Sequence, residues 1–194
     1  MACLQWRFLR SAYFKMRFIP TALADVYLIE PELISDERGF FARSYCQKEF
    51  AGHGLNLQPV QCNISFNKLR GTLRGMHFQR QPHAEAKLVR CTAGAICDVI
   101  IDLREDSPTF SRWEAFELTA DNRTALYIPE GFAHGFQTLA DNTEVFYQMY
   151  SFFEGASAGG VRWDDPAFNI EWPLANPILS EKDQSYSDFD GFSL

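Results

Sequence analysis

The stretch Gly71-Thr72-Leu73-Arg74-Gly75-Met76-His77-Phe78-Gln79 sets an arginine and a histidine three positions apart, with a glycine between them. Its glycines interrupt any helical period, so we interpret it as a β-strand. Alternate residues of an extended chain share one face, and here that face carries Leu73, Gly75, His77 and Gln79.

Gly75 lies between the two side chains of chemical interest in this strand. A glycine inside a strand leaves room for a ligand or marks a kink, and a kink here would bring Arg74 to the same side as His77. A cation beside a titratable imidazole suits an anionic substrate that needs proton transfer. The alternative is an ordinary Arg–His pair in the core or on the surface.

The chain downstream contains short apolar segments separated by turn residues roughly every eight to twelve positions. Turn signals stand at Gly94, Ser107-Pro108, Asp121-Asn122, Pro129-Glu130-Gly131 and Asp141-Asn142. The predicted strands are 87–92, 96–103, 113–118, 124–128, 132–138 and 144–152. This spacing is typical of sandwiches and barrels, and it predicts an all-β, double-stranded antiparallel barrel with short peripheral helices.

Two short helices are expected outside the barrel. Ser44 and Gln47 have the spacing of a capping box, which predicts a helix through Phe50 that ends at the glycines that follow. The segment from Val161 onward is rich in Trp, Pro and Asp. We expect it to wrap the outside of the barrel, with a short terminal helix at most.

With 194 residues, 46% of them hydrophobic, the chain is long enough to bury one sizeable core, which predicts a single domain. We assign that domain to residues 16–194 and treat residues 1–15 as an extension outside the fold. Basic residues recur through the first 17 positions and break up the apolar core that a signal peptide needs. A natural start at Met16 explains the extension, and a transit peptide is the alternative.

The charge balance argues against nucleic acid as a partner. The net charge is -7; the first 24 residues hold four bases and no acid, so the remainder carries 14 bases against 25 acids, or -11. A phosphate backbone needs a basic surface, whereas a phosphorylated small molecule needs only a few local cations.

The cysteines and the hydropathy pattern favour a cytoplasmic protein. The five cysteines are odd in number and none forms a Cys-x-x-Cys pair, which predicts reduced thiols. No run of 18 or more apolar residues occurs, so no membrane partner is expected.

A second histidine, His134, follows the turn Pro129-Glu130-Gly131. A Pro-Gly turn that leads into a strand with an inward histidine resembles the second sequence motif of the cupin superfamily. Phe132, His134 and Phe136 fall on one face by the two-residue period, so His134 lies among aromatic side chains. The alternative is a packed core imidazole. In a cupin, His77 and His134 would face the same cavity.

A metal site would need more ligands than these two histidines. Metal-binding cupins usually supply a His-x-His pair where this chain has His77-x-Gln79, and a neutral amide is a poor substitute for imidazole. We therefore expect neither a metal nor another cofactor. The alternative is a metal-dependent cupin oxygenase or isomerase that uses His77, His83, Glu85 and His134.

Seven motifs in order, between about residues 16 and 183, make a specific resemblance. They are Asp36-Glu37-Arg38-Gly39-Phe40-Phe41, Leu73 through Gln79, Lys87-Leu88-Val89-Arg90, Ser107-Pro108-Thr109-Phe110, Ile128 through Phe136, Trp163-Asp164-Asp165-Pro166 and Leu179-Ser180-Glu181-Lys182-Asp183. With them the chain resembles the dTDP-4-dehydrorhamnose 3,5-epimerase family, metal-free jelly-roll cupins (double-stranded β-helices) that act on nucleotide-linked 4-keto-6-deoxy sugars. The resemblance implies a cofactor-free epimerase of deoxysugar (rhamnose-type) biosynthesis and a homodimer.

Inversion of a carbon beside a ketone needs a base, a group that holds the enolate oxygen, and an acid on the opposite face. The resemblance implies that His77 is the base and Asp183 its partner. It also implies that Lys87 stabilises the enolate and that Tyr147 is the acid. Without the resemblance, Asp183 would be a solvated charge, Lys87 a surface residue and Tyr147 a core residue. Asp98 is a further candidate to orient Lys87 or His77, and the alternative is an exposed carboxylate that faces a turn.

A diphosphate favours arginine, whose planar guanidinium binds two oxygens at once. The resemblance places further substrate-binding residues at Arg38, Phe41, Arg43, Gln61, Asn63, Arg74, His134, Phe153 and Lys182. Among them, Arg38 and Arg74 would bind the diphosphate, and Phe41 and Phe153 offer stacking surfaces.

Four positions depart from the family pattern at the nucleotide end. Arg43 and Ala158 stand where acids are frequent, Phe153 replaces a tyrosine, and Ile64 replaces a histidine. The residues implied in proton transfer are all present, so we expect the epimerase chemistry to be retained. Our hypothesis is that the sugar or its nucleotide differs from that of the dTDP-rhamnose precursor. The motifs also leave open epimerisation at C3 alone and a non-catalytic sugar-nucleotide binding module.

Overall fold

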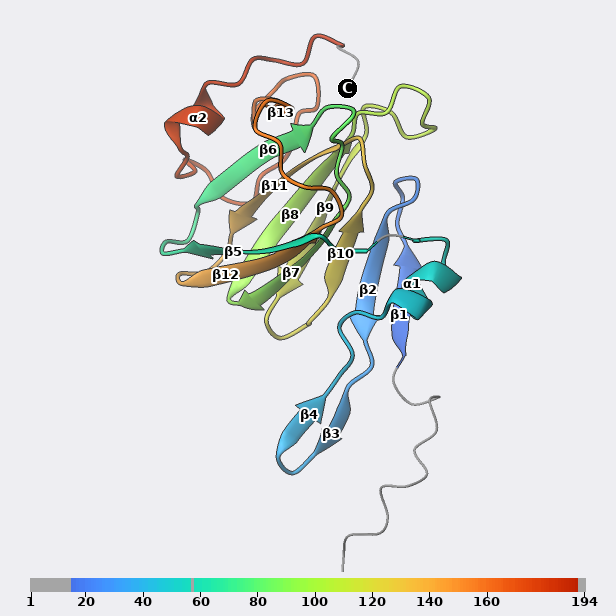
Figure 1. Cartoon of the computed structure of the whole chain (residues 1–194). Helices are drawn as coiled ribbons and strands as arrows, with labels where there is room; N and C mark the ends of the chain where they lie inside the picture. The colour runs from blue at the N-terminus through green and yellow to red at the C-terminus, as the bar shows by residue number, and fades with distance from the viewer. Residues whose placement is uncertain (1–14, 57, 192–194) are drawn as a thin grey trace, which may run out of the picture.

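The computed structural model describes residues 15–56 and 58–191. The predictions for residues 1–14 therefore lie outside the described residues. Two sheets face each other and form a barrel (Figure 1). Every pairing between named strands in the described part of the chain is antiparallel, which confirms the predicted all-β barrel.

The larger sheet has six strands in the order β1-β2-β10-β7-β12-β5. Their bounds are Met16–Pro20 (β1), Tyr27–Pro31 (β2), Ala125–Ile128 (β10), Lys87–Ala93 (β7), Thr143–Met149 (β12) and Gln61–Asn67 (β5). The smaller sheet has five strands in the order β13-β6-β11-β8-β9. Their bounds are Ala158–Gly160 (β13), Leu73–Gln79 (β6), Phe132–Thr138 (β11), Ala95–Asp102 (β8) and Trp113–Thr119 (β9). A separate hairpin joins β3 (Ile34–Asp36) to β4 (Gly39–Phe41), and the helices are α1 (Gln47–Gly52) and α2 (Glu181–Gln184).

The hydrophobic core lies between the two sheets. Its main cluster combines Val89, Leu126 and Val145 of the larger sheet with Ile100 and Leu118 of the smaller one. All five are completely buried, and burying one such side chain contributes roughly 1.5–3 kcal/mol. This core holds the strands that carry the predicted chemistry in fixed positions.

The predicted strands agree with the structure except at one end. Strand β11 coincides with the predicted strand 132–138; β7, β9 and β10 differ from their predictions by one residue at one end, and β8 by one residue at both ends. Strand β12 ends at Met149 instead of continuing to residue 152. Beyond Tyr150 the chain turns toward β6, where the carbonyl of Phe152 accepts a hydrogen bond from Nε2 of Gln79.

Helix α1 ends at Gly52 as predicted, but the predicted capping box is wrong. The N-cap is Cys46, and no side chain caps the helix. Ser44 lies two residues ahead of the N-cap, where its carbonyl accepts a hydrogen bond from Nη2 of Arg90 at 2.8 Å. That contact holds the backbone of Ser44 against β7 before the helix begins. Among the described residues, no helix has the length and apolar character needed to cross a membrane.

The β3–β4 hairpin extends away from the barrel (Figure 1). Its surface is unusually apolar, because Leu33, Ile34, Phe40 and Phe41 are all exposed. The guanidinium of Arg123 lies 4.4 Å from the ring centre of Phe40 and forms a cation–π contact with the hairpin.

The segment from residue 161 to the end of the described chain runs outside the smaller sheet, as predicted (Figure 1). Nε1 of Trp113 donates to the carbonyl of Phe168 at 2.8 Å. The side chain of Gln137 exchanges two hydrogen bonds of 2.9 Å with the backbone of Leu174. These contacts carry α2 to the edge of β6, beside His77.

Candidate active site

The site begins with an irregularity in the pairing of β6 with β11. His77 lies opposite His134, and the register then shifts by one residue before Arg74. The shift brings Arg74 and His77 to the same cavity although they are three positions apart, which confirms the predicted kink. Gly75 has a φ of +133°, and a Cβ atom there would lie 2.5 Å from Cα of Gly135. Only glycine fits this approach of the two strands.

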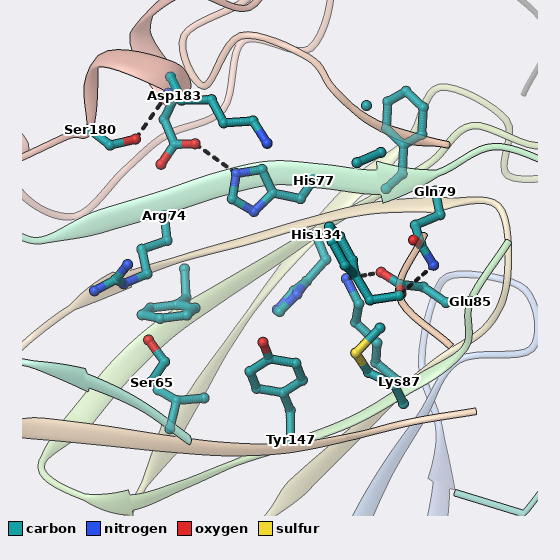
Figure 2. A pocket seen from close by; sticks show the side chains of 18 of the residues that line it. Ser65, Arg74, His77, Gln79, Glu85, Lys87, His134, Tyr147, Ser180 and Asp183 are labelled. Atoms are coloured by element: carbon teal, nitrogen blue, oxygen red, sulfur yellow. Dashed lines mark hydrogen bonds and ion pairs between the residues drawn. The ribbon is translucent and has the colours of Figure 1, made fainter. Parts of the chain in front are cut away.

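A cavity of about 640 Å³ opens between the sheets at this point. Figure 2 shows the side chains that project into it from β5, β6, β7, β11, β12 and the C-terminal segment. Eight of the sequence-predicted residues line it, namely Arg74, His77, Lys87, His134, Tyr147, Phe153, Lys182 and Asp183.

His77 and Asp183 form a hydrogen-bonded pair, with 2.7 Å between Nε2 and Oδ1. Ser180 caps α2 by accepting the backbone N–H of Asp183 at 3.1 Å, which fixes the carboxylate behind the ring. Burial raises the pKa of Asp183, but the hydrogen bond and charge of His77 lower it by more. Hydrogen bonds from Ser180 and the backbone of Gly75 make smaller contributions in the same direction. The pKa of Asp183 is therefore below its ordinary value. The carboxylate is therefore ionised at neutral pH, and Nε2 carries the proton that it accepts.

Lys87 reaches the cavity from β7 as a nearly buried ammonium group. Its Nζ lies 2.7 Å from Oε1 of Glu85, and its side chain is only 10% exposed. The suggestion that Asp98 orients Lys87 or His77 is wrong. Asp98 is completely buried and lies 2.9 Å from Nε2 of His134, because β8 pairs with β11. The other carboxylate oxygen of Asp98 has no hydrogen-bond partner among the described residues.

His134 thus belongs to a second His–Asp pair that faces the same cavity as His77. Its ring centre lies 6.5 Å from that of Phe136, so the predicted aromatic surroundings are confirmed. His134 is only 9% exposed yet lines the cavity, so its imidazole is packed in the core and faces the site at the same time.

Tyr147 lies on β12 and faces the cavity together with Val145 and Met149, as the two-residue period predicts. Its strand belongs to the larger sheet, whereas His77 belongs to the smaller one, so the two side chains approach from opposite walls (Figure 2). Burial, and to a lesser extent the charge of Glu85, raise the pKa of Tyr147. The phenol therefore stays protonated at neutral pH.

The predicted nucleotide-binding residues divide into two groups. Arg74, Lys182 and Phe153 line the cavity, and Phe153 is 58% exposed. Gln61 and Asn63 contact residues of the cavity wall instead. Oε1 of Gln61 accepts the backbone N–H of Phe153 at 2.6 Å, and Asn63 donates to the sulfur of Met149 at 3.3 Å.

Arg38, Phe41 and Arg43 do not reach the cavity of their own chain. Arg38 forms an ion pair with Asp36 on the same hairpin, and Phe41 is 63% exposed. Arg43 forms an ion pair of 2.8 Å with Glu49 of α1.

Two further residues shape the site without having been assigned a role from the sequence. Tyr186 contacts the edge of His77 with 5.9 Å between ring centres, and no pattern in the tail distinguishes it. Ser180 stands three residues before Asp183, which is the spacing of a helix N-cap and a signal that could have revealed its role.

The alternative metal site does not assemble. Within residues 15–56 and 58–191, no group of three or more His, Cys, Asp or Glu side chains is arranged to hold a metal ion. His83 is exposed and does not line the cavity, and Glu85 is bound to Lys87.

The fold and the cavity define an antiparallel β-barrel protein equipped for acid–base chemistry on a bound small molecule. The sequence model of the dTDP-4-dehydrorhamnose 3,5-epimerase family matches residues 20–191. The chain therefore belongs to this family, has its cupin fold, and is a carbohydrate epimerase of the isomerase class.

Individual relatives agree with this assignment. The chain is 45% identical over 181 residues to a dTDP-4-dehydrorhamnose 3,5-epimerase of Shigella flexneri, covering 91% of this chain and 99% of the relative. A crystal structure of the Bacillus anthracis dTDP-4-dehydrorhamnose 3,5-epimerase with TDP and PPi bound has a TM-score of 0.88 and 44% identity over 90% of this chain and 100% of its own. The Legionella pneumophila dTDP-6-deoxy-D-glucose-3,5-epimerase in complex with dTDP-4-keto-L-rhamnose has a TM-score of 0.85 and 36% identity over 90% and 93% of the two chains.

Proposed function

We propose that this protein inverts the two carbons that flank the ketone of dTDP-4-dehydro-6-deoxyglucose, at C3 and C5, in deoxysugar (rhamnose-type) biosynthesis. The observation that carries the proposal is the His77–Asp183 pair facing Tyr147 across one cavity that Lys87 also lines (Figure 2). Family membership supports the substrate class of a nucleotide-linked 4-keto-6-deoxy sugar.

His77 is the base. Its Nε2 proton is held by Asp183, so Nδ1 carries the lone pair that takes the proton from the sugar carbon. The C–H bond breaks, its electron pair forms the carbon–carbon double bond of the enolate, and the ketone oxygen becomes negative. The ring becomes an imidazolium, which the ionised Asp183 stabilises. No electron leaves the substrate, so the step needs no oxidant.

Lys87 holds the enolate oxygen. The side chain of Lys87 is nearly buried, so little water screens its ammonium group. It therefore attracts a developing negative charge more strongly than an ammonium group in bulk water would. Tyr147 then gives its phenolic proton to the carbon from the opposite face and inverts the centre. Replacing His77 by Asn would remove the first step, whereas Tyr147→Phe would remove only the last.

The nucleotide binds at the mouth of the cavity. Arg74 and Lys182 supply positive charge for the diphosphate, His134 contacts the sugar end, and the exposed ring of Phe153 offers a surface for the base. Gln61 and Asn63 support this wall through Phe153 and Met149.

We also propose a homodimer in which the β3–β4 hairpin of one copy enters the site of the other. Arg38, Phe41 and Arg43 lie away from the cavity of their own chain, and the hairpin exposes apolar side chains that a second copy would cover. The single cupin domain would comprise residues 16–194. Four cysteines in the described chain are free thiols, which supports a cytoplasmic location.

The test is deuterium uptake from heavy water into dTDP-4-keto-6-deoxyglucose, measured by mass spectrometry. We expect the wild-type protein to incorporate deuterium at both C3 and C5, and the His77→Asn protein to incorporate none. Uptake at C3 alone would identify a monoepimerase. No uptake would overturn the proposed substrate, and a Tyr147→Phe protein should exchange deuterium while forming little inverted product.

A further inference from the structure

Three side chains that line one end of the cavity, those of Gln79, Glu85 and Lys87, are joined by a hydrogen bond and an ion pair. Gln79 of β6 is 2% exposed, and its Nε2 donates to Oε2 of Glu85 at 2.9 Å. The other oxygen of the same carboxylate, Oε1, lies 2.7 Å from Nζ of Lys87. The side chains of Glu85 and Lys87 are 7% and 10% exposed, so water competes little for either contact.

The amide of Gln79 has only one workable orientation. Its Nε2 faces three oxygens, those of Glu85, the His83 carbonyl at 2.9 Å and the Phe152 carbonyl at 3.3 Å. Its Oε1 accepts the backbone N–H of Glu154 at 2.6 Å. A flipped amide would set an oxygen against three oxygens and an NH₂ against an N–H. Gln79 is therefore fixed, and it fixes the carboxylate of Glu85 in turn.

Lysine needs such a fixed partner because its ammonium sits on a flexible four-carbon stem. We infer that Glu85 and Gln79 are positioning residues for Lys87: the carboxylate aims the ammonium into the cavity, and the amide holds the carboxylate. This inference rests on the proposed role of Lys87 at the enolate oxygen. It gives Gln79, which occupies the place of a metal ligand in other cupins, a different task in this one.

The same amide also holds the segment that carries Phe153. Its partners Phe152 and Glu154 are the two neighbours of that residue in the sequence. Gln79 thus links two parts of the site. One is the cavity wall where the nucleotide base would stack, and the other is Lys87 at the enolate oxygen. Loss of Glu85 should therefore lower kcat with little effect on KM, whereas loss of Gln79 should lower kcat and raise KM together.

The experiment is a double-mutant cycle on the deuterium-exchange rate with dTDP-4-keto-6-deoxyglucose, using Glu85→Gln, Lys87→Met and the double variant. Glu85→Gln keeps the shape of the side chain, so the fold should persist, and melting temperature and dTDP binding by calorimetry check this. We expect Glu85→Gln alone to lower kcat about 10- to 100-fold. We expect it to change the rate less than about twofold when Lys87 is already Met, because coupled residues are non-additive. Glu117→Gln, at an exposed position of β9, is the matched control and should leave the rate unchanged.

Each outcome decides a separate point. If Glu85→Gln lowered the exchange rate by the same factor in the wild-type protein and in the Lys87→Met protein, the inference would be overturned and the proposed function would remain in place. A Lys87→Met protein with undiminished exchange would overturn both the inference and the role of Lys87. A Gln79→Met protein that remains folded, with kcat lowered and KM raised about three-fold or more, would support the link to Phe153; wild-type kcat and KM would overturn it.

Discussion

Nε2 of His77 lies 2.7 Å from Oδ1 of Asp183, although 106 positions separate the two residues in the chain. The pair forms because the C-terminal segment crosses the smaller sheet and forms α2 there, and the N-cap Ser180 of this helix holds Asp183 in place. The base of the proposed reaction is therefore assembled from a barrel strand and a peripheral tail.

The first prediction concerns this pair. Asp183→Asn keeps the size of the side chain but can present an N–H to Nε2, which favours the wrong tautomer of His77. We expect kcat to fall about 10²- to 10⁴-fold with KM changed little. Steady-state kinetics measure this, and Lys182→Met serves as a comparison that should raise KM instead. A kcat within about threefold of wild type would show that the carboxylate does not assist the base.

The second prediction concerns the nucleotide end. Phe153→Ala removes an exposed ring at the cavity mouth, and stacking of one base on an aromatic side chain contributes about 1–3 kcal/mol. We expect KM to rise roughly 5- to 150-fold while kcat changes little. The same assay with dTDP- and CDP-linked 4-keto sugars tests the hypothesis of a changed nucleotide. A clear preference for the dTDP sugar would count against that hypothesis.

The sequence predicts the parts of this site that depend on residues near one another in the chain, and it does not predict the parts that depend on distant segments. The two-residue period of an extended chain is local, so strand β11 and the shared face of Val145, Tyr147 and Met149 were predicted correctly. The partner of Asp98 was not, because it depends on β8 lying next to β11 in the sheet order. The sheet order follows from packing of the whole chain, which no local pattern records.

The kink at Gly75 was predictable because glycine is the one residue whose presence in a strand signals a special backbone. The roles of Glu85 and Tyr186 were not, since each acts through a neighbour that only the fold supplies. The capping box failed for a related reason. Ser44 and Gln47 have the spacing of a capping box, but α1 begins with Cys46 as its N-cap, two residues beyond Ser44, whose carbonyl accepts a hydrogen bond from Arg90 of a distant strand.

The third prediction tests the proposed exchange of hairpins between two copies. Arg38→Ala and His77→Asn should each inactivate the protein alone. Co-expression should restore activity, because a mixed dimer unites the intact hairpin of one copy with the intact cavity of the other. Random pairing makes half of the dimers mixed with one good site in each, so we expect about a quarter of wild-type activity. If activity did not recover, Arg38 would act in the cavity of its own chain or in neither cavity.

The fourth prediction uses the glycine that shapes β6. Gly75→Ala adds a Cβ 2.5 Å from Cα of Gly135 at a φ of +133°. Overpacking and an unfavourable backbone together should lower the free energy of unfolding by about 2–5 kcal/mol. Urea unfolding measures this loss. Gly52→Ala in α1 is the control, since its Cβ would meet nothing within 4 Å and should leave the stability unchanged or slightly raised.

The fifth prediction concerns Asp102, a completely buried carboxylate at the end of β8. Nε of Arg104 lies 2.9 Å from its Oδ1, and the hydroxyls of Ser107 and Thr109 donate to Oδ2 at 2.5 and 2.7 Å. Burial raises the pKa of Asp102, but these hydrogen bonds outweigh it and lower the pKa below the ordinary value. Its contribution to stability is therefore complete above the unfolded-state pKa of about 3.9 and is lost as the pH falls through the lower pKa of the folded protein.

Asp102→Asn should consequently cost about 3–5 kcal/mol at pH 7, because it removes the buried one of the two carboxylates that pair with Arg104 and replaces one of its two acceptor oxygens with a donor. The difference in unfolding free energy between wild type and variant should shrink as the pH is lowered below about 4. Urea titrations from pH 7 to pH 3 measure both effects. Asp102 and its three partners do not line the cavity, so turnover per folded molecule should be retained. A difference that stays constant across this pH range would show that the charge of Asp102 does not stabilise the fold.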